Sequence, residues 1–186
     1  MVLKFNNSAN YTHIPFFKKR LLEAIGLILL IISTIIAASI ITFDINDPSF
    51  SYLSDSATNN ILGKYGAYTS DLLIKLFGAS SVLIFLISFA WGLKLFIHKK
   101  ITFFWLRLIF VPITLLSTSI ALNIENIFNI NLEGGGIVGK YTFLYITNFL
   151  QHINFEISQI YISILFFLIA FFSFNFSLGL NQSDWI

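Results

Sequence analysis

Four long apolar stretches dominate the pattern along the chain, and shorter polar segments separate them. No Asp, Glu, Lys or Arg occurs in residues 24–43, 76–93, 108–124 and 157–183. A helix rises about 1.5 Å per residue and the hydrocarbon core of a bilayer is about 30 Å thick, so about 20 residues can cross it. In hydrocarbon the backbone must satisfy its own hydrogen bonds, so these stretches are predicted as helices. With their apolar flanks they give four spans, at about 22–43, 76–97, 103–124 and 158–180.

Two further segments have the pattern of helices that lie along a membrane surface. In residues 61–77 apolar positions alternate with polar ones at near-helical spacing, and Asp71 can pair with Lys75 one turn later. Residues 141–153 are uncharged but too short to cross a bilayer, and they follow the glycines at 134–136. Both segments are predicted as amphipathic helices on the outer side, either interfacial or re-entrant.

The composition agrees with a membrane protein and excludes several other classes. Hydrophobic residues make up 56% of the 186 residues and charged residues only 11%, with a mean hydropathy of +0.83. Soluble domains carry about a quarter charged residues, so a soluble enzyme is excluded, as is a disordered chain. A net charge of +2 argues against a nucleic-acid-binding surface. The chain has no cysteine, so disulfides and thiolate chemistry are absent.

The scarce charges are sorted between the two sides of the predicted spans. One side carries eight basic residues: Lys4, Lys18, Lys19, Arg20, Lys94, Lys99, Lys100 and Arg107. The other side carries three basic residues (Lys64, Lys75 and Lys140) and seven acidic ones: Asp44, Asp47, Asp55, Asp71, Glu125, Glu133 and Glu156. The positive-inside rule places the first side in the cytoplasm. The predicted fold is an all-α integral membrane protein with four transmembrane helices and both termini cytoplasmic: a tail at 1–20 and a membrane domain at 21–186.

The positions of two basic residues and two glycine pairs add detail. Lys94 and Arg107 are close enough to helix ends to extend into the lipid headgroups. Gly63-x-x-Gly66 precedes the second span much as Gly136-x-x-Gly139 precedes the fourth. Each half of the chain then runs span, loop, glycine-led interfacial helix and span, so the halves are candidates for a parallel internal repeat.

Catalytic and ligand-binding patterns are weak. Residues 134–142 read GGGIVGKYT, which matches the glycines and lysine of a P-loop, but Tyr141 replaces the Ser or Thr that would hold magnesium. The glycines are therefore interpreted as a turn and a site of close packing. No histidine has metal-ligand spacing with a carboxylate, and the span centres carry only uncharged Ser, Thr and Asn. We expect no catalytic residue, no cofactor and no metal.

Three blocks together resemble one known family. The first span is followed by Asp47-Pro48-Ser49-Phe50-Ser51, then comes Gly63-Lys64-Tyr65-Gly66-Ala67-Tyr68-Thr69-Ser70-Asp71-Leu72, and last Gly135-Gly136-Ile137-Val138-Gly139. From about residue 20 to residue 180 the chain is similar to the N-terminal four-helix membrane domain of the FtsK/SpoIIIE family of bacterial DNA translocases. Structural roles are expected for eight residues of these blocks: Asp47, Pro48, Gly63, Gly66, Asp71, Gly135, Gly136 and Gly139. Pro48 would fix a turn outside the membrane, and Asp71 would anchor the interfacial helix either through Lys75 or by hydrogen bonds.

The resemblance implies a non-enzymatic membrane anchor and assembly module in cell division and chromosome segregation. It implies a multi-pass protein of the bacterial inner membrane, enriched at the division septum, that forms homo-oligomers and contacts other division proteins. DNA and ATP would be bound only through a motor domain, which these residues do not contain.

Two other functions remain open from the residues themselves. The possible repeat and the interfacial segments fit a small transporter or channel component, although ionisable groups at mid-membrane are missing. A membrane enzyme at the external face would have Asp71, Glu133 or His152 to use, but no spacing supports it.

Overall fold

The structure is a computed structural model that describes residues 15–53, 57–98, 101–123, 134–154 and 157–179. Its helices are α1 (Phe16–Ile41), α2 (Gly63–Phe77), the short 3-10 helix η1 (Gly78–Ser81), α3 (Val82–His98), α4 (Phe104–Ala121), α5 (Gly136–His152) and α6 (Gln159–Leu178). The described part of the chain is helical and contains no strand. The predicted all-α fold is confirmed.

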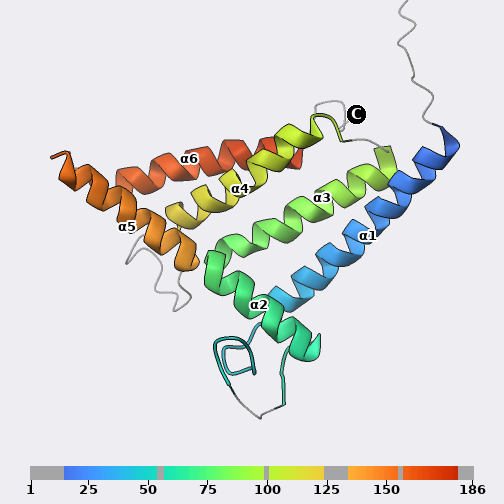
Figure 1. Ribbon diagram of the computed structural model, residues 1–186, viewed down its shortest axis with the longest axis horizontal. Coiled ribbons are helices and arrows are strands. Elements are labelled where there is room, and N and C mark those ends of the chain that lie inside the picture. The colour runs from blue at the N-terminus through green and yellow to red at the C-terminus, as the bar shows by residue number, and fades with distance from the viewer. Residues whose placement is uncertain (1–14, 54–56, 99–100, 124–133, 155–156, 180–186) are drawn as a thin grey trace, which may run out of the picture.

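Four helical segments are long and apolar enough to cross a membrane: α1, the continuous stretch from α2 through α3, α4 and α6. The start of α1, the turn from α3 to α4 and the end of α6 lie at one end of the long helices (Figure 1). This arrangement agrees with the orientation that the charges predict, in which this end is cytoplasmic. The end of the predicted tail at 15–20 is described, and α1 already begins within it at Phe16.

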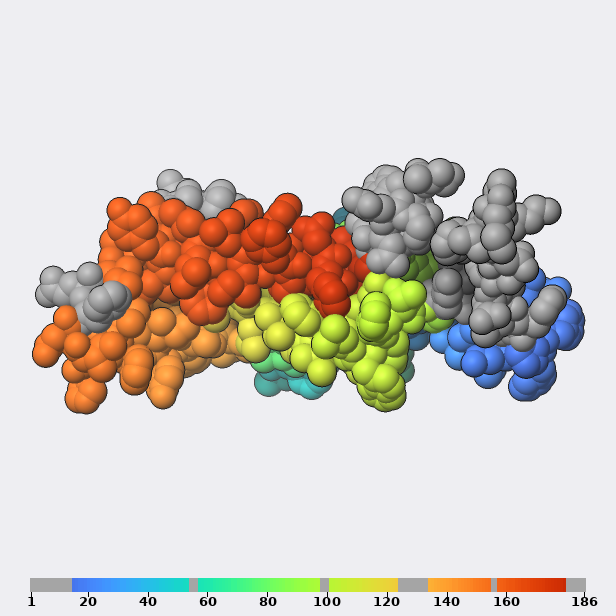
Figure 2. Space-filling view, turned by 90° about the horizontal axis from the view of Figure 1, so that it is seen from above, coloured from blue at the N-terminus to red at the C-terminus, as the bar shows by residue number. Residues whose placement is uncertain are grey.

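The long helices form two antiparallel pairs. In the first, α1 packs against α3, and their backbones approach closely where Gly26 faces Gly92: a Cβ at Gly26 would lie 2.6 Å from Phe96 N. In the second, α4 packs against α6 along their length (Figures 1 and 2), with the hydroxyls of Thr114 and Ser173 hydrogen-bonded at 3.0 Å. Small residues allow close helix approach in a bilayer, where packing and hydrogen bonds replace the hydrophobic effect as the driving force.

The shorter helices α2 and α5 join the two pairs. They follow one another across the end opposite to the α3–α4 turn (Figure 1); α2 packs on α1, α5 packs on α4, and α2 contacts α5. Gly78, with φ of 59°, ends α2 and is the first residue of η1, which leads into α3. Such an angle is accessible to glycine without steric penalty, which explains why the apolar run ending in α3 is not one straight helix.

The interior is built largely from small polar side chains. Ile120, Phe143 and Ile162 form an apolar cluster between α4, α5 and α6. Elsewhere the most completely buried side chains are short and hydroxylated: Ser33, Ser39, Ser70, Ser80, Ser81, Thr114, Ser119 and Ser177. The large apolar side chains of the four spans mostly face outward, as expected where lipid is the solvent.

The two halves repeat the same order of elements. Gly63 and Gly136 each begin the surface helix of their half, with φ of 61° and 63°. Ser39 and Ser119 each stand two residues before the end of the preceding long helix, and each contacts the second glycine of its half, Gly66 or Gly139. The structure therefore supports the internal repeat that the glycine spacing suggests.

Candidate assembly site at the outer end

Asp47 is the centre of a hydrogen-bonded cluster between the end of α1 and the start of α2. Its side chain is 1% exposed. One carboxylate oxygen accepts the backbone N–H of Asn59 at 2.7 Å and the other accepts that of Asn60 at 2.9 Å. Hydrogen bonds to a charged carboxylate are stronger than those between neutral groups, so Asp47 holds the end of the loop at Asn59 and Asn60 in place. Pro48, next to it, is also buried and lies in the bend that directly follows the turn at 45–46, close to where the sequence predicts a turn.

Asn60 continues this cluster into both helices, and the sequence reasoning did not single it out. Its side-chain amide donates to Ser39 O at 2.9 Å and to Thr42 O at 3.1 Å. Its side-chain oxygen accepts the N–H of Leu62 at 3.1 Å. Asn60 therefore satisfies carbonyls at the C-terminal end of α1 and an amide at the N-terminal end of α2, groups that helix termini leave free. Its position three residues before a glycine-led helix was the available signal.

The glycines at the start of α2 have two different roles. A Cβ at Gly66 would lie 2.0 Å from Asn60 Oδ1, and Gly66 O accepts the hydroxyl of Ser39 at 2.6 Å. Gly66 thus permits the close approach of α1, α2 and the loop. At Gly63 a Cβ would meet nothing within 4 Å, so the positive φ alone favours glycine there.

Asp71 fixes the loop to the middle of α2. Its side chain is 3% exposed, and one oxygen accepts the N–H of Ser51 at 3.1 Å and the hydroxyl of Ser51 at 2.8 Å. The ring of Phe50 packs edge-on against Tyr68 at 4.7 Å in the same region. Of the two anchoring contacts expected for Asp71, the hydrogen bonds are present and the pair with Lys75 is not: the carboxylate turns inward to the loop while Lys75 stays exposed.

Asp44 lies at the surface of the same loop. Its carboxylate accepts the backbone N–H of Asn46 at 2.9 Å and the side-chain amide of Asn59 at 2.8 Å. These hydrogen bonds, that from the Asn46 backbone first and that from Asn59 second, lower the pKa of Asp44 below its ordinary value of 3.8. Both bonds favour the charged form.

The glycines at 134–139 form the junction between the two halves. Ala79 N donates to Gly134 O at 3.0 Å. A Cβ at Gly136 would lie 2.5 Å from Gly78 N, and Cβ atoms at Gly135 and Gly139 would lie 1.9 and 2.3 Å from Ser119 O. The hydroxyls of Ser80 and Ser119 are hydrogen-bonded at 2.6 Å across the same junction. The P-loop-like glycines are thus in contact with neighbouring backbone, which is the close-packing role that the sequence interpretation gives them.

A second cluster closes the opposite, predicted cytoplasmic end. We call it the C-terminal clamp: Trp91 and Lys94 of α3 and Arg107 of α4, gathered around the end of α6. Trp91 Nε1 donates to Ser177 O at 2.8 Å, and Lys94 Nζ donates to Gly179 O. Arg107 is 3% exposed, and a Cβ at Gly179 would overlap its guanidinium.

The clamp corrects the expected positions of Lys94 and Arg107. Both side chains turn toward the end of α6: Lys94 donates to Gly179 O, while the buried Arg107 lies beside Gly179 and donates to Thr102 Oγ1 at 2.8 Å. The C-terminal end of a helix carries a partial negative charge and unpaired carbonyls, both of which attract cations. The C-cap Gly179, with φ of 68°, leaves room for the guanidinium.

Catalytic and metal-binding arrangements find no support in the described residues. None of them form a group of three or more His, Cys, Asp or Glu that could hold a metal ion. Of the three residues considered for an external enzyme, Asp71 is held by Ser51, His152 lies exposed at the end of α5, and Glu133 is outside the described residues. What the two clusters can do is hold helices and loops in fixed positions.

Comparison with known proteins identifies the family. The family described as the 4TM region of DNA translocase FtsK/SpoIIIE matches residues 18–185. The chain is 32% identical over 135 residues to DNA translocase FtsK of Rickettsia typhi, 31% over 141 residues to that of Rickettsia prowazekii, and 38% over 77 residues to that of Brucella melitensis. These alignments cover 73%, 76% and 41% of this chain, but 17%, 18% and 9% of the relatives.

The match therefore concerns a small part of those translocases, less than a fifth of their length. No solved structure matches the chain. The matched residues include the outer-end cluster around Asp47, the Asp71 contact, the glycine junction, the C-terminal clamp and four helices able to span a membrane. This chain belongs to the family of four-transmembrane regions of FtsK/SpoIIIE DNA translocases.

Proposed function

We propose that this chain is the membrane anchor and assembly module of an FtsK-like DNA translocase at the division septum. The observation that carries the proposal is the family match over residues 18–185, the region that holds four helices able to span a membrane. The matched region is the membrane part of the family and not its motor. DNA and ATP are accordingly handled by a motor region outside these residues, and the role of this chain is non-enzymatic.

The geometry supports a module that holds and presents rigid surfaces. Asp47 and Asp71, each buried and hydrogen-bonded to the loop, fix the outer loop on α1 and α2. A fixed loop outside the membrane is a surface that other division proteins can recognise with little loss of conformational entropy. Homo-oligomers would present several such loops together, which raises avidity without a new contact.

A localisation experiment tests the proposal. The full chain, fused to a fluorescent protein and produced in a related dividing bacterium, should concentrate at midcell in cells with a closing septum. Asp47→Ala should reduce this enrichment while leaving the protein in the membrane. Asn46→Ala, which changes the exposed residue directly before Asp47 in the same loop, is the matched control. Even distribution of the unaltered chain around the cell would refute the septal role.

A chimaera tests the anchor role separately. Residues 1–186 joined to the remaining part of a related translocase that lacks its own membrane region should restore division and chromosome segregation. Failure of the chimaera to restore either, despite stable insertion in the membrane, would contradict the role as an anchor and assembly module.

A further inference from the structure

The exposed charges of the two surface helices are all positive at neutral pH. The sequences of α2 and α5 contain Lys64, Lys75 and Lys140 but only one acidic residue, Asp71. All three lysines are exposed, whereas Asp71 is buried and turned toward Ser51. The side of the membrane that has the acidic excess in sequence therefore carries a basic surface on these two helices.

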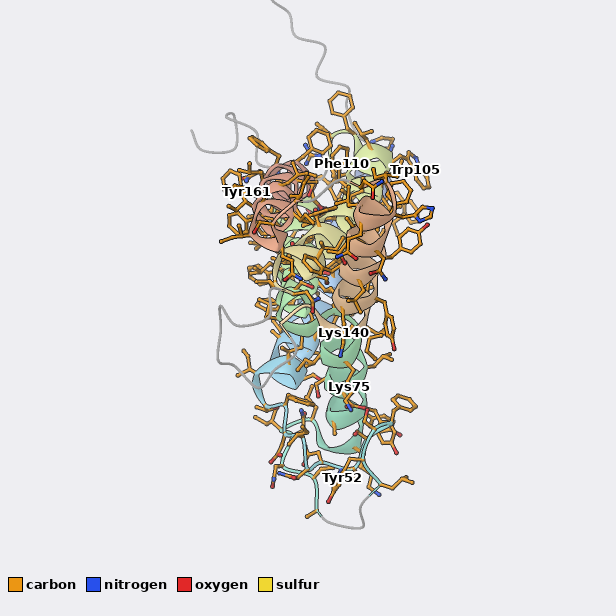
Figure 3. The ribbon with its side chains drawn as sticks, turned by 90° about the vertical axis from the view of Figure 1, so that its left-hand side faces the viewer. Tyr52, Lys75, Trp105, Phe110, Lys140 and Tyr161 are labelled. Carbon is orange, nitrogen blue, oxygen red and sulfur yellow. The ribbon has the colours of Figure 1, made fainter. Side chains whose placement is uncertain are left out.

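The fold brings the lysines of different halves onto one stretch of surface. The carbonyl of Leu76 lies against Gly136, so Lys75, one residue earlier, is close to the start of α5. Lys140 is one helical turn after Gly136. Figure 3 shows Lys75 and Lys140 one after the other on the two helices. Lys64 precedes Lys75 by about three helical turns and so shares its face of α2.

Aromatic residues of the type found at membrane interfaces accompany these lysines. Tyr65, Tyr141 and Tyr145 are 89%, 68% and 74% exposed. Exposed tyrosines with an apolar ring and a polar hydroxyl concentrate at headgroup level, as do lysines with their long apolar stems. Leu72 and Leu144 are exposed on the same helices and supply the apolar contact that a surface helix needs.

We propose that this surface, which we call the lysine ledge (Lys64, Lys75 and Lys140 with Tyr65, Tyr141 and Tyr145), binds the phosphate groups of anionic phospholipids in the outer leaflet. The charge is complementary, and the tyrosines set the ledge at the depth of the phosphates. A lysine near an anionic membrane surface strengthens binding by about fivefold. The ledge thus selects lipid by charge, a property separate from septal recruitment.

Photo-crosslinking in vesicles tests the proposal at the site itself. The full chain is reconstituted in phosphatidylcholine vesicles with a trace of a photoactivatable phosphatidylglycerol or of the matching phosphatidylcholine, and crosslinked peptides are identified by mass spectrometry. Peptides of α2 and α5 should capture the phosphatidylglycerol probe about fivefold or more in excess over the phosphatidylcholine probe. In K75Q/K140Q this preference should fall to about one, and K75R/K140R should retain it.

A matched variant at the opposite membrane side separates the ledge from the other basic residues. K18Q/K19Q removes two exposed lysines from the start of α1 and should leave the preference at α2 and α5 unchanged. An equal capture of both probes by the unaltered chain would overturn the proposal. So would a preference that survives in K75Q/K140Q, or one that disappears in K18Q/K19Q. Circular dichroism of each variant verifies that the helices are retained.

Discussion

Replacement of Asp71 by alanine should loosen the outer loop from α2, and the structure gives the size of the effect. The variant removes the acceptor of two hydrogen bonds from Ser51, at 3.1 and 2.8 Å. A hydrogen bond to a charged group contributes about 1.5–3 kcal/mol. Ser51 is exposed, so water replaces part of the loss there. We therefore expect Asp71→Ala to lower the free energy of unfolding by about 2–4 kcal/mol.

A double-mutant cycle assigns the effect to the contact. Ser51→Ala removes the hydroxyl donor but keeps the backbone N–H, so it should cost about 1 kcal/mol. The coupling energy of Ser51→Ala with Asp71→Ala should be about 1 kcal/mol, because the hydroxyl has no acceptor to lose once Asp71 is removed. Lys75→Ala should change the free energy of unfolding by less than about 0.5 kcal/mol and show no coupling to Asp71, because the Lys75 side chain is exposed.

The measurement is unfolding of the detergent-solubilised chain by increasing fractions of sodium dodecyl sulfate, followed by far-ultraviolet circular dichroism. Coupling of Asp71 to Lys75 instead of Ser51 would refute the reasoning, because it would mean that the local ion pair forms and the loop contact does not. A stability of Asp71→Ala equal to that of the unaltered chain would refute it as well.

Three more predictions concern the junction, the acid side of the pH range and the topology. Gly136→Ala should destabilise the chain by about 2 kcal/mol more than Gly63→Ala in the same unfolding assay, because both positions have positive φ but only the first would place a Cβ against backbone; equal losses would contradict the close packing. The pKa of Asp44 is lowered in the folded chain, so the stability that its carboxylate contributes is complete above the ordinary value of 3.8 and is lost as the pH falls through the lowered value. The free energy of unfolding of Asp44→Asn, measured against pH, should therefore fall less on acidification than that of the unaltered chain. An identical pH profile of the two proteins would count against this prediction. Since the chain has no cysteine, Tyr52→Cys should react with an impermeant maleimide added outside intact spheroplasts and Trp105→Cys only after lysis; the reverse order would invert the topology.

Hydropathy was sufficient to predict the transmembrane spans, because the bilayer requires a helix that crosses it to be apolar along its whole length. The predicted spans near 22–43 and 158–180 correspond to α1 at Phe16–Ile41 and α6 at Gln159–Leu178. The surface helix at Gly63–Phe77 also follows from its amphipathic spacing. These helices could be predicted because the periodicity that identifies each of them lies within its own residues.

Contacts between distant residues could not be obtained in this way. The partner of Asp71 stands twenty residues earlier in the loop, while helical spacing pointed only to Lys75. Arg107 and Lys94 turn inward because the end of α6 lies beside them, and the position of α6 is a property of the fold. The glycines of the junction were interpreted as packing residues, but their neighbour Ser119 is identified only by the structure.

The C-terminal clamp has a mechanical consequence for the chain that leaves α6. A pull applied beyond Gly179 acts on residues that contact Lys94 of α3 and Arg107 of α4. Trp91 of α3 holds the last turn of α6 through its hydrogen bond to Ser177 O. The pull is therefore shared among α3, α4 and α6, and α6 does not peel away from its neighbours one contact at a time. A pull on the end of α6 therefore acts on contacts with two other helices, α3 and α4, and not on α6 alone.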